Sequence, residues 1–97
     1  MDRTSKIIMK KKMKVTDLAG EKVMVDFEQG KYFCIKGVGN EIWDMLEETL
    51  AAGEAALPVE EILDRLLAEY DVAEEVCEEE VLAFLRTLAD TGIVECA

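Results

Sequence analysis

The sequence predicts an α+β domain, with a small antiparallel sheet first and helices after it. Before residue 37, apolar residues tend to alternate with polar ones, as in strands that have one wet face. After residue 40, apolar residues recur at helical spacing. The change of period falls within residues 31–46, KYFCIKGVGNEIWDML, which also hold the only tryptophan. A chain of 97 residues is enough for one modest core, so we expect one domain.

Three strands are predicted in the first part of the chain, at about residues 9–16, 21–27 and 31–36. Residues 1–6 are polar, and we expect them to form a disordered tail before a single domain at 7–97. The lysines at 10–12 are typical of a guarded edge strand. A nucleic-acid patch is the alternative interpretation of these lysines.

The connection at residues 28–30 sets the register of the second and third strands. A three-residue loop with a left-handed Gly30 would pair Phe27 with Lys31 and Val25 with Phe33. A two-residue loop would instead place Val25 on the face of Tyr32. The three-residue loop collects more apolar side chains on one face, so we predict it. Those side chains are Val23, Val25, Phe27, Phe33 and Ile35.

Helices are predicted at about residues 38–50, 58–70 and 72–91. Gly37 and Gly39 are expected to let the chain bend before the first helix. Gly92 is suited to the end of the third helix. A sheet followed by three helices gives an architecture like that of winged helix-turn-helix proteins.

Charge is distributed unevenly along the chain, whose net charge is −11. Residues 1–39 carry nine Lys or Arg and five Asp or Glu, whereas residues 40–97 carry two Lys or Arg and seventeen Asp or Glu. An acidic helical half repels DNA and anionic membranes and attracts basic partners. A DNA-binding winged-helix regulator remains the alternative function, and a gel shift at low salt would discriminate it. No apolar run approaches the roughly 20 residues of a membrane span, so no membrane partner is expected.

The residue types argue against catalysis and against a metal or cofactor site. Histidine is absent, and the only serine is Ser5. The cysteines Cys34, Cys77 and Cys96 are widely spaced, so no zinc site is expected. Reduced thiols are typical of a cytoplasmic protein. The glutamates lie on predicted solvent faces, whereas acid–base chemistry needs carboxylates that are held in a pocket. We therefore expect a protein that is not an enzyme and needs no cofactor.

The strand at residues 31–36 is the last of its sheet, so one side of it could be an unpaired edge. Such an edge beside an apolar helix can accept an extended peptide as an added strand. Cys77, Val81 and Phe84 of the third helix could form the wall of that groove, or could simply be core. An open edge also permits a homodimer through edge pairing or strand exchange.

Three segments carry a family resemblance. They are GKYFCIKGVGNEIWDML at 30–46, VEEILDRLLAEYDV at 59–72 and EEEVLAFLRTLADTGIV at 78–94. In their order and spacing, residues 13–94 resemble the PqqD family, the peptide chaperones and RiPP recognition elements of ribosomal peptide modification. Two features depart from the family pattern. Ile35-Lys36 stands where the family has Leu-Asn, and this difference affects the bend before the first helix. The linker at 51–57 is longer than is usual in the family.

The resemblance implies a non-catalytic adaptor that binds the leader segment of a ribosomally made precursor peptide by strand addition. It would present that peptide to a modifying enzyme, such as a radical SAM maturase or a leader peptidase. The resemblance places leader binding on the strand and on the third helix. The residues implied are Lys31, Tyr32, Phe33, Cys34, Ile35 and Lys36 on the strand side and Cys77, Glu80, Val81 and Phe84 on the helix side.

Overall fold

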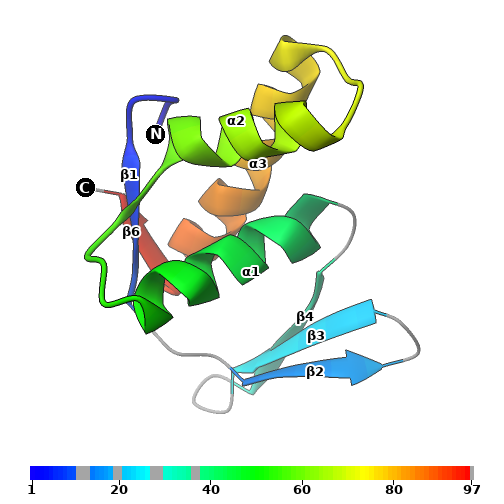
Figure 1. Cartoon of the computed structure of the whole chain (residues 1–97). Coiled ribbons are helices and arrows are strands. Elements are labelled where there is room, and N and C mark those ends of the chain that lie inside the picture. Colours follow the sequence, from blue (N-terminus) through cyan, green and yellow to red (C-terminus); the bar gives the residue numbers. More distant parts are fainter. Residues whose placement is uncertain (11–13, 19–20, 27–29, 36–37, 97) are drawn as a thin grey trace.

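The structure is a computed structural model that describes residues 1–10, 14–18, 21–26, 30–35 and 38–96 (Figure 1). Its strands are β1 (Lys6–Met9), β2 (Lys14–Leu18), β3 (Glu21–Asp26), β4 (Lys31–Ile35), β5 (Leu57–Pro58) and β6 (Val94–Cys96). Its helices are α1 (Val38–Ala51), α2 (Val59–Glu69) and α3 (Glu74–Asp90). The α+β class, with an N-terminal antiparallel sheet before three helices, is confirmed.

The strands form two separate three-stranded sheets, ordered β5-β1-β6 and β2-β3-β4. The first of these was not predicted. It joins the start of the chain, the connection before α2 and the C-terminal strand, all in antiparallel pairing. Figure 1 shows this sheet beside the helices, away from the hairpin strands β2, β3 and β4.

The predicted first strand at 9–16 is wrong, because that stretch is divided between the two sheets. β1 ends at Met9 and pairs with β5 and β6, whereas β2 begins at Lys14 and pairs with β3. β1 also begins at Lys6, within the segment expected to be a disordered tail. Arg3 lies in that segment, and its Nη2 donates to Glu74 of α3 at 2.8 Å.

The predicted register between β3 and β4 is also wrong, by one residue. Lys31 pairs with Asp26, and Cys34 pairs with Val23. Gly30 does adopt a positive φ of 65°, as expected. The face that packs on the core carries Met24 and Ile35, which are 0% and 1% exposed. Ile35 was expected on the inner face and does lie there, whereas Val23 and Val25, which were expected beside it, are only partly buried.

The three helices pack together over one core. Its largest fully buried side chains include Trp43 and Leu46 of α1, Leu63 of α2 and Leu85 of α3. Lys22 of β3 forms a salt bridge with Asp44 of α1, which ties the hairpin sheet to that helix. Within the described part of the chain, none of the helices has the length and apolar character needed to cross a bilayer.

Gly39 does not act as a bend, because it lies in the first turn of α1. A Cβ built there would come within 3.0 Å of Phe84 Cε1 and 3.1 Å of Ile35 Cγ2. Gly39 therefore allows the Phe84 ring to approach the backbone of α1 closely. Gly37 lies outside the described residues.

Candidate functional site

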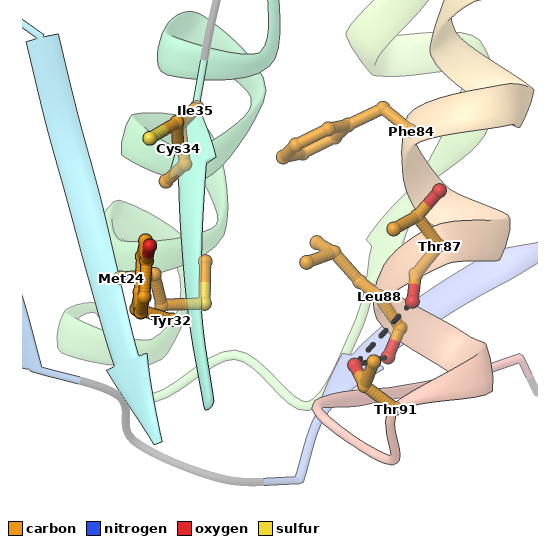
Figure 2. A pocket seen from close by; sticks show the side chains of 8 residues that line it. All are labelled: Met24, Tyr32, Cys34, Ile35, Phe84, Thr87, Leu88 and Thr91. Atoms are coloured by element: carbon orange, nitrogen blue, oxygen red, sulfur yellow. Dashed lines mark hydrogen bonds between the residues drawn. The ribbon is translucent and has the colours of Figure 1, made fainter. Parts of the chain in front are cut away.

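An open hollow of about 300 Å³ lies between β4 and α3. Its lining is formed by Met24, Tyr32, Cys34 and Ile35 on the sheet side and Phe84, Thr87, Leu88 and Thr91 on the helix side. In Figure 2 the Phe84 and Leu88 side chains point from α3 toward the sheet, across the gap. Phe84 stands level with the Ile35 end of β4, and Thr91 lies toward the end where β4 begins (Figure 2).

β4 is an edge strand in the described part of the chain, because its sheet ends there. Which of its backbone groups face outward follows from the ladder between β2 and β3. Leu18 pairs with Glu21 across a connection of only two residues, so this closing pair exchanges hydrogen bonds. Alternation along β3 then directs the backbone groups of Lys22, Met24 and Asp26 toward β4.

The same alternation continues across to β4. Phe33 pairs with Met24 and Ile35 pairs with Lys22, so the backbone groups of these two β4 residues bond to β3. The N–H and C=O groups of Tyr32 and Cys34 therefore point away from β3, toward the free edge. Both residues also line the hollow, and the Tyr32 side chain is 72% exposed. Among the described strands none pairs with this edge, so it presents backbone donors and acceptors directly beside the hollow.

The helix wall of the hollow is largely apolar in character. Leu88 is 3% exposed, and Phe84 is partly buried against the core. The two threonine hydroxyls donate within their own helix, Thr87 Oγ1 to the Ala83 carbonyl at 3.0 Å and Thr91 Oγ1 to the Leu88 carbonyl at 2.9 Å. Because those donors are already used, they do not leave unpaired hydroxyl hydrogens in the wall.

The described residues show no sign of a metal centre or of an activated nucleophile. No group of three or more Cys, Asp or Glu side chains among them is arranged to hold a metal ion. Burial raises the pKa of the Cys77 thiol, which keeps it protonated and unreactive. The outer side of α3 carries Glu75, Glu79 and Glu80, a charge that repels a phosphate backbone.

A family model described as "Coenzyme PQQ synthesis protein D (PqqD)" matches residues 21–94, which include the whole hollow. This chain belongs to the PqqD family. The resemblance predicted from the three sequence segments is therefore confirmed.

A solved structure described as "TbiB1 in Complex with the TbiA(beta) Leader Peptide" has the same fold as this PqqD-family chain. The two are 32% identical, and the superposition has a TM-score of 0.71. The match covers 91% of this chain and 94% of TbiB1. No curated protein matches the chain.

The structure distributes the predicted site residues of this PqqD-family chain among four environments. Tyr32, Cys34, Ile35 and Phe84 line the hollow together. Lys31 and Phe33 belong to β4 through their backbone pairing with β3, and Lys36 lies outside the described residues. Cys77 and Val81 are 4% and 0% exposed and belong to the core. Glu80 is exposed on α3, outside the lining of the hollow.

Sequence reasoning missed four lining residues, namely Met24, Thr87, Leu88 and Thr91. The three on α3 follow Phe84 at spacings of three, four and seven, which is the spacing of one helical face. That spacing was present in the sequence, but two of the three residues are threonines, a type that is mostly exposed in proteins. Met24 was missed because the predicted register placed it on the opposite face.

Proposed function

We propose that this chain binds the leader segment of a ribosomally made precursor peptide in the hollow between β4 and α3. The leader adds to the sheet as a further strand on β4, with side chains entering the hollow. The observation that carries the proposal is the free edge of β4, whose Tyr32 and Cys34 backbone groups face outward beside an apolar wall. Membership in the PqqD family and similarity to TbiB1, solved with a leader peptide, support it.

Strand addition suits the physical character of this site. Backbone hydrogen bonds to the edge supply affinity for any extended chain, whereas the hollow selects among side chains. Apolar surface of the peptide that Phe84 and Leu88 bury contributes about 25 cal/mol of binding free energy per Å². The side chains of the peptide are therefore selected by α3, and the β4 edge holds the peptide backbone in an extended conformation.

The chain acts as an adaptor rather than as a catalyst. It holds the leader so that a modifying enzyme, such as a radical SAM maturase or a leader peptidase, can act on the rest of the precursor. We place this activity in the cytoplasm, consistent with three cysteines that are widely spaced in the sequence. A second copy of the chain could compete for the same edge and give a homodimer.

The test is a fluorescence-polarisation titration with the labelled N-terminal part of the precursor peptide encoded beside the gene of this chain. We expect saturable binding that Cys34→Pro weakens by about 10- to 100-fold, because an unmade buried hydrogen bond costs about 1–3 kcal/mol. Proline removes the N–H that the free edge presents, and edge strands tolerate proline.

Cys34→Ala is the matched control, since it removes the thiol but keeps the N–H. It should bind within about threefold of the unchanged chain, a difference well under one hydrogen bond. Circular dichroism shows whether both variants are folded. A folded Cys34→Pro variant with unchanged affinity would exclude the β4 edge as the binding site. Weaker binding at higher chain concentration would indicate that a homodimer occupies the edge.

A further inference from the structure

The outward side of α3 extends the hollow toward the N-terminus of the helix. Thr91, Thr87 and Phe84 line the hollow, and Ala83, Glu80 and Val76 continue the same stripe at spacings of three and four. Val76 is 49% exposed, and Glu80 and Ala83 are exposed as well. The stripe is therefore an accessible surface that is continuous with the hollow.

This stripe continues well beyond the end of β4. Phe84 lies level with Ile35, since a Cβ on Gly39 would meet both side chains at 3.0–3.1 Å. α3 begins at Glu74, ten residues before Phe84, which corresponds to about 15 Å of helix at 1.5 Å per residue. An extended peptide that leaves the edge of β4 past Ile35 thus has about four or five residues alongside this part of α3, at about 3.3–3.6 Å each.

The charge along this part of α3 is strongly negative. Glu75, Glu79 and Glu80 are exposed there. Glu74 Oε1 forms a salt bridge with Arg3 Nη2 at 2.8 Å, and Arg3 Nε also lies 3.8 Å from Oε1 of Glu60 in α2. The positive end of the helix dipole amounts to only about half a unit charge, so the carboxylates outweigh it.

We propose that the bound leader continues past Ile35 onto the stripe from Phe84 to Val76, and that it carries Lys or Arg side chains in that part. This inference rests on the function proposed above and specifies the class of peptide. The leader would then consist of an apolar segment in the hollow and a basic segment at one end of it. Val76 offers apolar contact for the methylene stems of those basic side chains.

Phage display of random peptides of about 20 residues on the immobilised full chain tests this without knowledge of the natural leader. We expect selected peptides to combine an apolar segment with Lys or Arg enriched on one and the same side of it. The double variant Glu79→Gln/Glu80→Gln should still select the apolar segment but lose the basic enrichment. Asp64→Asn/Glu69→Gln is the matched control, because it removes two exposed carboxylates from α2 instead, and it should keep the enrichment.

A selected peptide and its Lys-to-Ser counterpart then give the size of the effect. We expect the counterpart to bind about three- to tenfold more weakly at about 0.05 M salt, with a smaller difference at about 0.5 M. Apolar peptides without a basic side, or enrichment that survives in Glu79→Gln/Glu80→Gln, would overturn this inference alone. Failure to select any peptide that Cys34→Pro loses would overturn the proposed function as well.

Discussion

Sheet β5-β1-β6 and sheet β2-β3-β4 are each three strands wide, but their edges differ. In the first sheet the edge strands β5 and β6 have only two and three residues. Its central strand contributes Ile7, which is 1% exposed, and its neighbours contribute Leu57 and Val94 at 2% and 3%. This sheet joins both ends of the chain to the core, and its short edges offer little for another chain to pair with.

In the second sheet the edge strand β4 has five residues and lies beside an apolar hollow. One face of this sheet packs on the core through Met24 and Ile35, while Tyr32 and Cys34 on the other face are exposed. Natural proteins usually shorten or cover an edge of this length. The difference indicates that the first sheet serves stability, whereas the second keeps an edge available for binding.

The largest expected effect is a difference in stability between variants of the two sheets. Ile7→Ala should lower the free energy of unfolding by about 2–5 kcal/mol, because it leaves a cavity where β1 meets the core. Val25→Ala, on the partly covered face of the hairpin sheet, should cost about 1 kcal/mol or less. Urea denaturation measures both values. Equal losses in the two variants would contradict the division of roles.

The next effect concerns the β4 edge itself. The amides of Phe33 and Ile35 should exchange with solvent at least about a hundredfold more slowly than those of Tyr32 and Cys34, because only the first two bond to β3. Residue-resolved hydrogen exchange by NMR checks this pattern in the free chain. When the leader binds, hydrogen exchange at the Tyr32 and Cys34 amides should slow to rates close to those of Phe33 and Ile35. The opposite alternation in the free chain would show that the deduced register is wrong.

The sequence was sufficient for β3, β4 and the helices because each of these has a clear period of its own. It was not sufficient for the sheet β5-β1-β6, whose strands have two to four residues and come from three distant parts of the chain. Strands of that length carry too little alternation to be recognised. Their pairing is decided by contacts of Ile7, Leu57 and Val94 with the helices, which local pattern does not contain.

The error in the β3–β4 register has a physical reason. Val23 and Val25 outnumber Met24 as apolar residues, so alternation favoured the face that carries the two valines as the inner one. That face pairs Val23 with Cys34 and Val25 with Tyr32, and is left partly open next to the hollow. An apolar face that stays partly exposed resembles a core face in the sequence, so alternation alone does not tell the two faces apart.

A smaller effect is expected where α1 meets the hollow. In Gly39→Ala the new methyl would press on the Phe84 ring, which is only partly buried and can move into the hollow, and on Ile35 Cγ2, which is buried and has little room to move. The gain in helix propensity, at most about 1 kcal/mol, would offset only part of this crowding, so stability should fall by about 1 kcal/mol. Leader affinity should also fall about three- to tenfold, because the displaced ring fills binding space.

Phe84→Leu keeps an apolar wall and removes the ring that the methyl would strike. In a double-mutant cycle, Gly39→Ala should therefore weaken binding less in the Phe84→Leu background than in the unchanged chain. Fluorescence polarisation measures affinity and urea denaturation measures stability for all four proteins. Additive effects on affinity would show that Gly39 and Phe84 do not act together.

The smallest effect is the titration of Tyr70, which is the C-cap residue of α2. The Tyr70 hydroxyl donates to Glu41 of α1, and this hydrogen bond raises the pKa of Tyr70 above its ordinary value of about 10. The unfolded chain therefore loses this proton at lower pH than the folded chain. The contribution of Tyr70 to stability should be complete below about pH 10 and should decline as pH rises through the folded pKa. Absorbance at alkaline pH in a Tyr32→Phe background follows Tyr70 alone, and Glu41→Gln should lower its pKa toward the ordinary value. An unchanged titration in Glu41→Gln would mean that this contact does not hold the α2–α3 connection against α1, and that packing alone positions the start of α3 above the hollow.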